Sequence, residues 1–195
     1  MSAARLLGRP VVAYVGLGSN VGDRLAALRA AVAVLDGHAQ TAVEAASPVY
    51  ETEAHVLPGA PPQRDHLNAV VRVRSRLRPE AFLREVAWDA ERRAGRDPDA
   101  APWSPRPLDV DVLVWGDLVV PGPGPSVGPG PGAGPDGRPA PPGAVVVPHP
   151  RLAERRFVLR PLADLAVPGL GATVAELLAA TPDRSRVDRT ALALG

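Results

Sequence analysis

The order in which two kinds of hydrophobic periodicity follow one another constrains the fold of this chain more than any other feature. Apolar residues at every second position are typical of strands, and apolar residues three or four apart are typical of helices. The first pattern predicts strands at residues 11–16, 41–50, 68–76 and 108–115. The second pattern predicts helices at residues 23–35 and 79–94. The resulting order, strand-helix-strand-strand-helix-strand, indicates a ferredoxin-like α+β fold, with helices packed on a mainly antiparallel sheet.

The remaining segments differ in composition from this pattern. Residues 1–10 have too short an apolar run for a secretory signal and are interpreted as an N-terminal extension. Residues 121–144 are mostly Pro and Gly, which bury too little apolar surface to offset their ordering entropy, and we expect a disordered insertion there. A short helix is expected at 173–180 and a polar tail at 183–195. The sequence therefore predicts one domain, residues 11–182, with an insertion.

The composition excludes several classes of protein. The chain of 195 residues has a net charge of +1, which gives no sign of a nucleic-acid partner. It has no cysteine, so disulfides and thiolate metal sites are excluded, and no apolar run approaches the ~20 residues of a membrane span. We expect a cytoplasmic protein without a membrane partner. All 22 basic residues are arginines, so a phosphate would be held by arginine, backbone amides or a metal ion.

The segment WSPRPLDVDVLVWG, residues 103–116, places two aspartates in a run that otherwise predicts a buried strand. Asp109 and Asp111 are two residues apart, so their side chains point to the same face, about 6.6 Å apart. Two like charges beside apolar neighbours need a compensating cation, which is either an arginine or a divalent metal. Oxygen ligands without a nearby His or Cys favour Mg²⁺. Spacing alone leaves a magnesium site and a solvated acidic edge equally open.

Two arginines near the acidic strand favour phosphate chemistry. Arg96 and Arg106 flank a proline-rich loop that leads into this strand. Guanidinium groups beside Mg²⁺-binding carboxylates recur in phosphoryl transfer, where they stabilise charge on the transferred oxygens. Taken singly, each arginine would more commonly form a surface ion pair.

The segment GLGSNVG, residues 16–22, follows a predicted strand and precedes a predicted helix, as a dinucleotide-binding fingerprint does. Gly16 and Gly18 fit the first two glycines of that fingerprint, but Val21 stands where it has Gly or Ala. We interpret the segment as a tight turn, with Asn20 as a candidate cap of the following helix. A nicotinamide-dependent oxidoreductase is kept as an alternative function.

Four further residues have ordinary structural interpretations when they are considered singly. Asn68 begins a predicted strand and suits a turn or a cap. His149 lies between two prolines, and Phe157 precedes an apolar run, so both suit structural roles. Trp103 lies on a loop, where it suits either a cover over a flat ligand or an anchor for the loop.

Several motifs in one order resemble those of the 6-hydroxymethyl-7,8-dihydropterin pyrophosphokinase family. They are GLGSNVGDR, SPVYETE, DHLNAVV, EAFLREVAWDAERRAGR, WSPRPLDVDVLVWG and VPHPRLAERRFVLRPL. The resemblance runs from about residue 11 to about residue 166, and the W-x-P-R-x-L-D-x-D segment is specific to the family. The resemblance implies a ferredoxin-like fold and the transfer of pyrophosphate from ATP to the pterin hydroxymethyl group, which leaves AMP. It also implies two Mg²⁺ ions.

The resemblance implies roles for individual residues. The ligands of the Mg²⁺ ions would be Asp109 and Asp111. The arginines that contact the phosphates and assist transfer would be Arg96 and Arg106. The residues that bind or cover the pterin would be Thr52, His66, Asn68, Trp103 and Phe157. The residues on the ATP side would be Glu91, Val112, His149 and Arg155.

Four positions depart from the family pattern. Ser104 stands where the family usually has Gly, and His66 where it usually has an aromatic residue. Pro98 and Asp99 stand where basic residues are usual. The altered loop motivates a second hypothesis, a pterin- or nucleotide-binding homologue without catalysis. The expected partners are ATP and the pterin, and the expected state is a monomer or a weak association with folate-pathway enzymes.

Overall fold

The computed structural model describes residues 9–54, 61–100, 104–120, 145–168, 170 and 172–195. Trp103, the insertion predicted at 121–144 and most of the extension at 1–10 lie outside the described residues. None of the described helices combines the length and the apolar composition that a membrane span requires.

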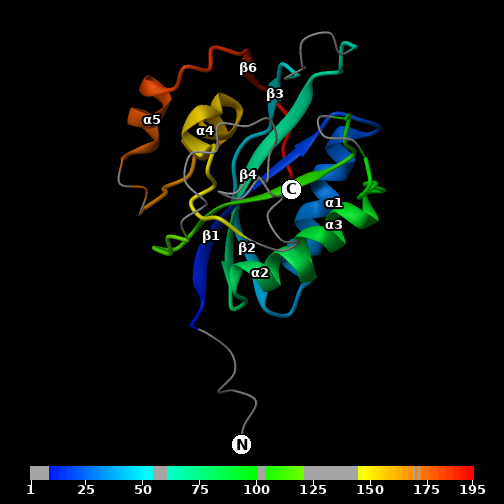
Figure 1. Cartoon of the computed structure of the whole chain (residues 1–195). Coiled ribbons are helices and arrows are strands. Elements are labelled where there is room, and N and C mark those ends of the chain that lie inside the picture. Colours follow the sequence, from blue (N-terminus) through cyan, green and yellow to red (C-terminus); the bar gives the residue numbers. More distant parts are fainter. Residues whose placement is uncertain (1–8, 55–60, 101–103, 121–144, 169, 171) are drawn as a thin grey trace, which may run out of the picture.

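The described residues form a six-stranded antiparallel sheet (Figure 1). The strands are β1 (Val11–Ser19), β2 (Thr41–Ala46), β3 (Tyr50–Thr52), β4 (His66–Ser75), β5 (Asp109–Trp115) and β6 (Val187–Arg189). Their order in the sheet is β5-β1-β4-β3-β6, and β2 also pairs with β4. Because β2 and β3 follow each other and both pair with β4, together they take the place of one predicted strand. The predicted ferredoxin-like α+β fold is confirmed.

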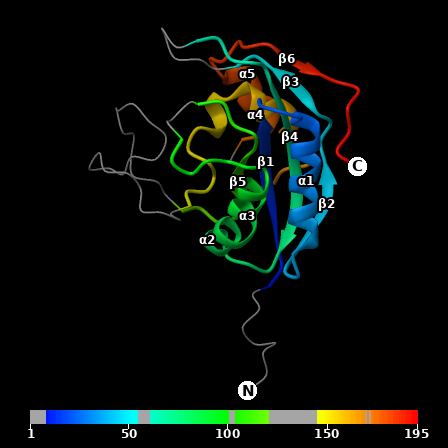
Figure 2. The ribbon, with the colours of Figure 1, turned by 90° about the vertical axis from the view of Figure 1, so that its right-hand side faces the viewer.

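Helices pack on both faces of this sheet (Figures 1 and 2). On one face are α1 (Arg24–Gly37), α2 (Pro79–Phe82), the π-helical turn η2 (Leu83–Ala87) and α3 (Trp88–Arg93). On the other side are the 3₁₀ turn η3 (Leu152–Glu154), α4 (Arg156–Leu162) and α5 (Val174–Ala180). The helix predicted at 79–94 is thus a continuous helical segment with a π turn in its middle. It begins at Pro79, whose missing N–H costs nothing at a first helical turn, and is followed by Gly95 at φ +81°.

The alternation of residues along β1 supplies two hydrophobic cores. Val15 and Leu17 are buried against α1, α2 and α3, whereas Tyr14 is buried on the side of α4 and α5. The first core also contains the edge-to-face pair of Phe82 and Trp115, whose ring centres are 5.3 Å apart. The first half of β1 is therefore covered on both faces.

The turn predicted at GLGSNVG begins later than the sequence suggested. Residues 16–19 are the last residues of β1 and are paired with β4 on one side, while residues 16–18 are also paired with β5 on the other. A dinucleotide fingerprint follows a parallel strand of a βαβ unit, whereas β1 is antiparallel to both neighbours. The structure therefore argues against the oxidoreductase alternative. Asp23, rather than Asn20, caps α1, and its carboxylate accepts the N–H of Ala26 at 3.0 Å.

The single strand predicted at 41–50 is interrupted between β2 and β3. Pro48 has no N–H to donate to a ladder, so regular pairing cannot continue through it. At this point the side chain of Ser47 replaces a backbone acceptor, because its Oγ accepts the N–H of Val70 at 2.9 Å. The interruption lets β2 and β3 pair with different parts of β4.

The C-terminal segment, predicted as a polar tail, pairs with the sheet. β6 is antiparallel to β3, at the edge of the sheet. Beyond it, Leu194 is buried in the first core, and Arg29 of α1 donates to the carbonyl of Ala193 at 2.9 Å. A single apolar side chain near the end of the chain thus anchors a segment that is polar overall.

We expect Leu194→Ala to lower the free energy of unfolding by about 2–3 kcal/mol, because a buried side chain leaves a cavity behind. Leu192→Ala is the matched control, since Leu192 is 39% exposed and Leu194 is 7% exposed. The control is expected to change stability by less than about 0.5 kcal/mol. Urea unfolding of both variants measures the difference, and equal losses would contradict the anchoring role.

Candidate active site

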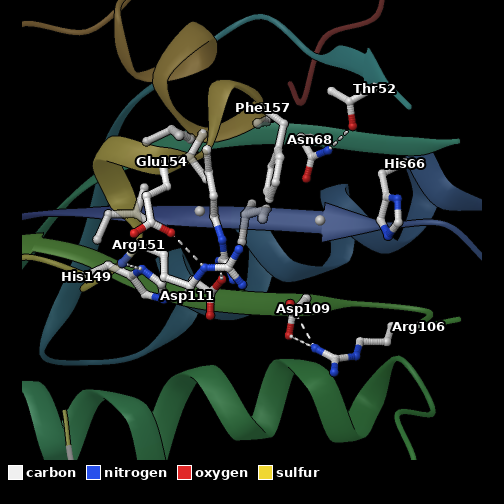
Figure 3. A pocket seen from close by; sticks show the side chains of 18 of the residues that line it. Thr52, His66, Asn68, Arg106, Asp109, Asp111, His149, Arg151, Glu154 and Phe157 are labelled. Atoms are coloured by element: carbon white, nitrogen blue, oxygen red, sulfur yellow. Dashed lines mark hydrogen bonds and ion pairs between the residues drawn. The ribbon is translucent and has the colours of Figure 1, made fainter. Parts of the chain in front are cut away.

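A cavity of about 800 Å³ lies on the α4 side of the sheet, over β4, β1 and β5 (Figure 3). The strand residues that line it include Gly16 and Gly18 of β1, Asn68 and Val70 of β4, and Asp109, Asp111 and Leu113 of β5. The register places Gly18 between Asn68 and Asp109. The central strand therefore separates an amide on one side from the carboxylates on the other.

The two glycines of β1 form the floor of this cavity. Strand residues two apart direct their side chains to the same face, and at Gly16 and Gly18 that face carries only hydrogen. A methyl group at Gly18 would lie 2.9 Å from Asn68 Oδ1, which is closer than packing allows. Because β4 and β5 are about 10 Å apart across β1, the glycines leave a gap wide enough for a ring system.

Both aspartates of β5 are paired with arginines. Asp109 Oδ1 accepts from Arg96 Nη1 at 2.6 Å, and Asp109 Oδ2 lies 3.2 Å from Arg106 Nη1. Asp111 Oδ2 lies 3.7 Å from Arg155 Nη1. β5 is an edge strand of the sheet, yet the face that carries the carboxylates meets three guanidinium groups. This arrangement does not fit a merely solvated acidic edge.

Glu91 of α3 connects the helix to the acidic strand from below the cavity. Its Oε1 accepts the N–H of Val110 at 2.9 Å and also pairs with Arg96. Burial raises the pKa of Glu91 to about 7, although the charge of Arg96 opposes the shift. Glu91 therefore fixes the Arg96 guanidinium between two carboxylates, its own and that of Asp109, and does not line the cavity.

The donor set on β5 fits Mg²⁺. Burial, followed by the charge of Asp109, raises the pKa of Asp111 to about 6. A divalent cation beside the two carboxylates would offset this repulsion. Across the described ranges, no group of three or more His, Cys, Asp or Glu side chains is arranged to hold a metal ion. Further ligands would therefore come from bound phosphate and water, which is usual for Mg²⁺.

The half of the cavity beside β4 presents an amide, a hydroxyl group and two rings. Asn68 Nδ2 donates to Thr52 Oγ1 at 2.7 Å, which leaves Asn68 Oδ1 toward Gly18. Phe157 of α4 and His66 lie on either side of Asn68 (Figure 3). Burial lowers the pKa of His66, so its ring is neutral at pH 7. These groups suit a flat heteroaromatic ligand with a polar edge.

His149 is a neutral N–H donor at the opposite end of the cavity. Its Nδ1 accepts the backbone N–H of Arg151 at 3.1 Å, which assigns the proton of the neutral ring to Nε2. Burial and the charges of Arg155 and Arg151 lower the pKa of His149 to about 4. Together with the two arginines, the Nε2–H suits an anionic ligand near Asp111 (Figure 3).

Most of the site residues named from the sequence line this cavity. They are Thr52, His66, Asn68, Arg96, Arg106, Asp109, Asp111, His149, Arg155 and Phe157. Val112 is not among them, because it alternates with Asp111 and its side chain, 6% exposed, belongs to the first core. Glu91 lies below the lining, and Trp103 lies outside the described residues.

Sequence reasoning missed several contributors, among them Arg151 and Glu154, which also line the cavity. The floor formed by Gly16 and Gly18 could have been predicted, since two glycines two residues apart at the end of a predicted strand leave one face of the strand without side chains. The buried Asn20 holds two loops together, which its sequence context does not reveal. The Oγ of Ser104 is buried beside the cavity and has no hydrogen-bond partner among the described residues.

The two halves of the cavity suit a phosphate-bearing ligand beside a flat heteroaromatic one. Comparisons with known proteins show the family of the chain. The sequence model of the 7,8-dihydro-6-hydroxymethylpterin-pyrophosphokinase (HPPK) family matches residues 14–167. The 2-amino-4-hydroxy-6-hydroxymethyldihydropteridine pyrophosphokinase of Bacillus subtilis is 34% identical over 154 residues, which cover 79% of this chain and 77% of that protein. The protein of the same name from Methylorubrum extorquens is 36% identical over 180 residues, which cover 91% and 97%.

The fold is also similar to that of larger proteins. A solved HPPK-DHPS chain of Plasmodium falciparum matches with a TM-score of 0.58 at 11% identity, covering 88% of this chain and 43% of that one. This likeness concerns the fold alone, and the present chain spans less than half of the Plasmodium chain. With the family match and the relatives above, the chain belongs to the 7,8-dihydro-6-hydroxymethylpterin-pyrophosphokinase family.

We expect His149 to make the stability of the protein depend on pH. Its pKa is about 4 in the folded protein and about 6.5 in the unfolded chain. Because only the unfolded state binds this proton between the two values, stability is complete above about pH 6.5 and falls by about 3 kcal/mol toward pH 4. Urea unfolding of the protein and of His149→Gln between pH 7 and pH 4 measures this. The same pH dependence in both would contradict the assignment.

Proposed function

We propose that the protein transfers pyrophosphate from ATP to the hydroxymethyl group of 6-hydroxymethyl-7,8-dihydropterin, which yields AMP and the pterin diphosphate, in folate biosynthesis. One observation carries this proposal. An acidic, arginine-rich half and an amide-and-ring half share one cavity, and only Gly18 separates Asn68 from Asp109. The reacting groups of a nucleotide and a pterin can therefore meet over the glycine floor.

The chemistry asks the protein for position and charge rather than for a covalent intermediate. The hydroxymethyl oxygen attacks the β-phosphorus of ATP, and the bond from this phosphorus to the oxygen it shares with the α-phosphate breaks, so that AMP leaves. We assign Arg96 and Arg106 to the oxygens of the transferred group, where planar guanidinium groups stabilise developing charge. Glu91 holds Arg96 in place through the contact described above.

We propose that Asp109 and Asp111 hold two Mg²⁺ ions together with the phosphates of ATP. When bound, these ions would neutralise phosphate charge and hold the phosphates in line for transfer. The carboxylates keep 32% and 38% of their side chains exposed to the cavity, so metal ions can reach them. The positive charge of two Mg²⁺ ions balances the negative charge of fully ionised ATP. The site would therefore gain no net charge when ATP binds together with both ions.

We assign the remaining lining residues to the two substrates. On the pterin side, Thr52 and Asn68 would hydrogen-bond the polar edge of the ring, while His66, Phe157 and Trp103 would contact its faces. On the ATP side are His149 and Arg155, with the backbone of Val112 nearby. The N–H of His149 and the guanidinium of Arg155 suit phosphate oxygens.

The proposed activity suggests where the protein is located in the cell and which partners it has. We propose a cytoplasmic protein that binds no nucleic acid. We further propose a monomer, or a weak association with other folate-pathway enzymes. Relatives named "Folate synthesis bifunctional protein" in Chlamydia caviae and Arabidopsis thaliana support this association, because 77% of the present chain matches only 29% and 26% of those proteins.

We expect Asp109→Asn and Asp111→Asn each to lower turnover by about 10³-fold or more, because each removes a charge that the metal and phosphates require. The assay measures AMP release from ATP, Mg²⁺ and the hydroxymethyl dihydropterin. Asp117→Asn is the matched control, since Asp117 follows the same strand but is exposed and does not line the cavity. If the wild-type protein bound ATP and the pterin but released no AMP, the result would instead favour the non-catalytic homologue.

We expect Gly18→Ala to raise the KM for the pterin at least about tenfold, because the new methyl group would displace the Asn68 amide. The KM for ATP should change much less. Gly37→Ala is the control, since a methyl group at Gly37 meets nothing within 4 Å. An unchanged KM for the pterin in Gly18→Ala would contradict the assignment of Asn68 to the pterin site.

A further inference from the structure

The chain segment that follows α5 borders the cavity. Pro182 and Asp183 line the cavity together with Phe157 of α4. This segment leads from α5 to β6, which lies beside β3 at the edge of the sheet (Figure 1). In that pairing Val187 is opposite Thr52, so the segment runs along the proposed pterin side. Asp183 is the first residue of the predicted polar tail, and it lies beyond residue 167, where the family match ends.

Asp183 caps the first turn of α4. Its Oδ2 accepts the backbone N–H of Arg156, the first residue of the helix, at 2.8 Å. The first N–H groups of a helix have no partner within the helix, and a capping oxygen satisfies one of them. Arg155 occupies the capping position before the helix, but its guanidinium group can only donate, so it cannot supply this oxygen. The cap therefore comes from a residue 27 positions further along the chain.

The helix α4 depends on contacts outside itself. It has seven residues, and helices this short are not stable alone. Pro161 lies inside it and has no N–H, so it cannot donate to the carbonyl of Phe157 four residues earlier. Phe157 is only partly buried against the second core. The position of the Phe157 ring therefore depends on the cap at the start of the helix.

The carboxylate of Asp183 is held in place by its own segment. Its Oδ1 accepts the N–H of Ser185 at 2.8 Å. The carbonyl of Arg186 accepts the N–H of Glu53, which also lines the cavity, at 3.1 Å. The pairing of β6 with β3 fixes the next residues. Because the segment is bonded to the sheet, the carboxylate is a fixed point against which the first turn of α4 is positioned.

We propose that Asp183 is a positioning residue for the pterin site. Its bond to Arg156 fixes the first turn of α4, and the next residue, Phe157, thereby presents its ring to the pterin. Asp183 acts through the helix and not by contact with the substrate. This inference rests on the proposed function, since it takes the pterin as the ligand beside Phe157.

The test measures the KM and kcat of AMP release, and the Kd of 6-hydroxymethyl-7,8-dihydropterin by calorimetry with a non-hydrolysable ATP analogue and Mg²⁺ present. In Asp183→Ala, we expect the Kd and the KM of the pterin to rise at least about tenfold, because the ring of Phe157 is no longer preorganised. The kcat and the Kd of the ATP analogue should change less than about threefold, because the groups assigned to the phosphates are retained.

Two further substitutions separate the position of the acceptor from its charge. Asp183→Asn keeps an oxygen acceptor for Arg156 and removes the charge, so the KM for the pterin should stay within about threefold of the wild-type value. Asp183→Glu keeps the charge and moves the acceptor by one methylene group, so this KM should rise at least about fivefold. An impaired Asp183→Asn would assign the effect to charge and overturn the positioning role.

A double-mutant cycle tests whether Asp183 acts through Phe157. In a Phe157→Leu background, Asp183→Ala should raise the KM for the pterin less than about threefold, because the ring that it positions is absent. An undiminished effect in that background overturns the inference.

Thr173→Ala is the matched control, since it also removes a helix cap. Thr173 Oγ1 accepts the N–H of Glu176 at the start of α5, at 3.2 Å and away from the cavity lining. Urea unfolding of this control should show lower stability, while its KM for the pterin stays at the wild-type value.

The outcomes separate the inference from the proposed function. A wild-type KM in folded Asp183→Ala or Asp183→Glu overturns the positioning role and leaves the proposed function intact. If Asp183→Ala does not fold, the comparison of Asp183→Asn with Asp183→Glu decides. A wild-type protein that binds no pterin and releases no AMP contradicts the proposed function itself. A KM raised by Ala and Glu but by neither Asn nor the Thr173→Ala control supports the inference.

Discussion

Strand β1 is bonded to β4 on one side and to β5 on the other, and this double pairing underlies both the fold and the site. Its first half has large side chains on both faces and builds two cores. Its second half keeps Leu17 on the core side but has Gly16 and Gly18 on the other. The strand therefore gains its stability from one face while the opposite face is left open for ligands.

Three arginines surround the two aspartates of β5, and the balance of charge accounts for this number once Glu91 is included. If Asp109, Asp111 and the buried Glu91 are all ionised, they balance Arg96, Arg106 and Arg155. In that state the cluster carries no net charge. The raised pKa values of Asp111 and Glu91 indicate that burial keeps the acidic charges costly.

Much of the fold followed from the sequence, because hydrophobic periodicity is a local property. The predictions placed the main helices and strands close to their observed bounds, and most of the site residues that motif order suggested line the cavity. The errors have physical reasons. Pro48 interrupts a strand whose alternation continues past it, and residues 16–18 pair on both sides despite their turn-like composition. Leu194 anchors a segment whose overall polarity concealed it.

The sequence by itself determined the order of the main strands and helices up to residue 115 and the acidic strand with Asp109 and Asp111, since periodicity and spacing are readable along the chain. Its composition limited the groups that could hold a phosphate to arginine, backbone amides or a metal ion. Only the tertiary structure decided that Gly18 lies between Asn68 and Asp109 and that Asn20 holds the loops of Gln63 and Arg106 together. Strand register and burial set those contacts, and both depend on residues that are distant in the chain.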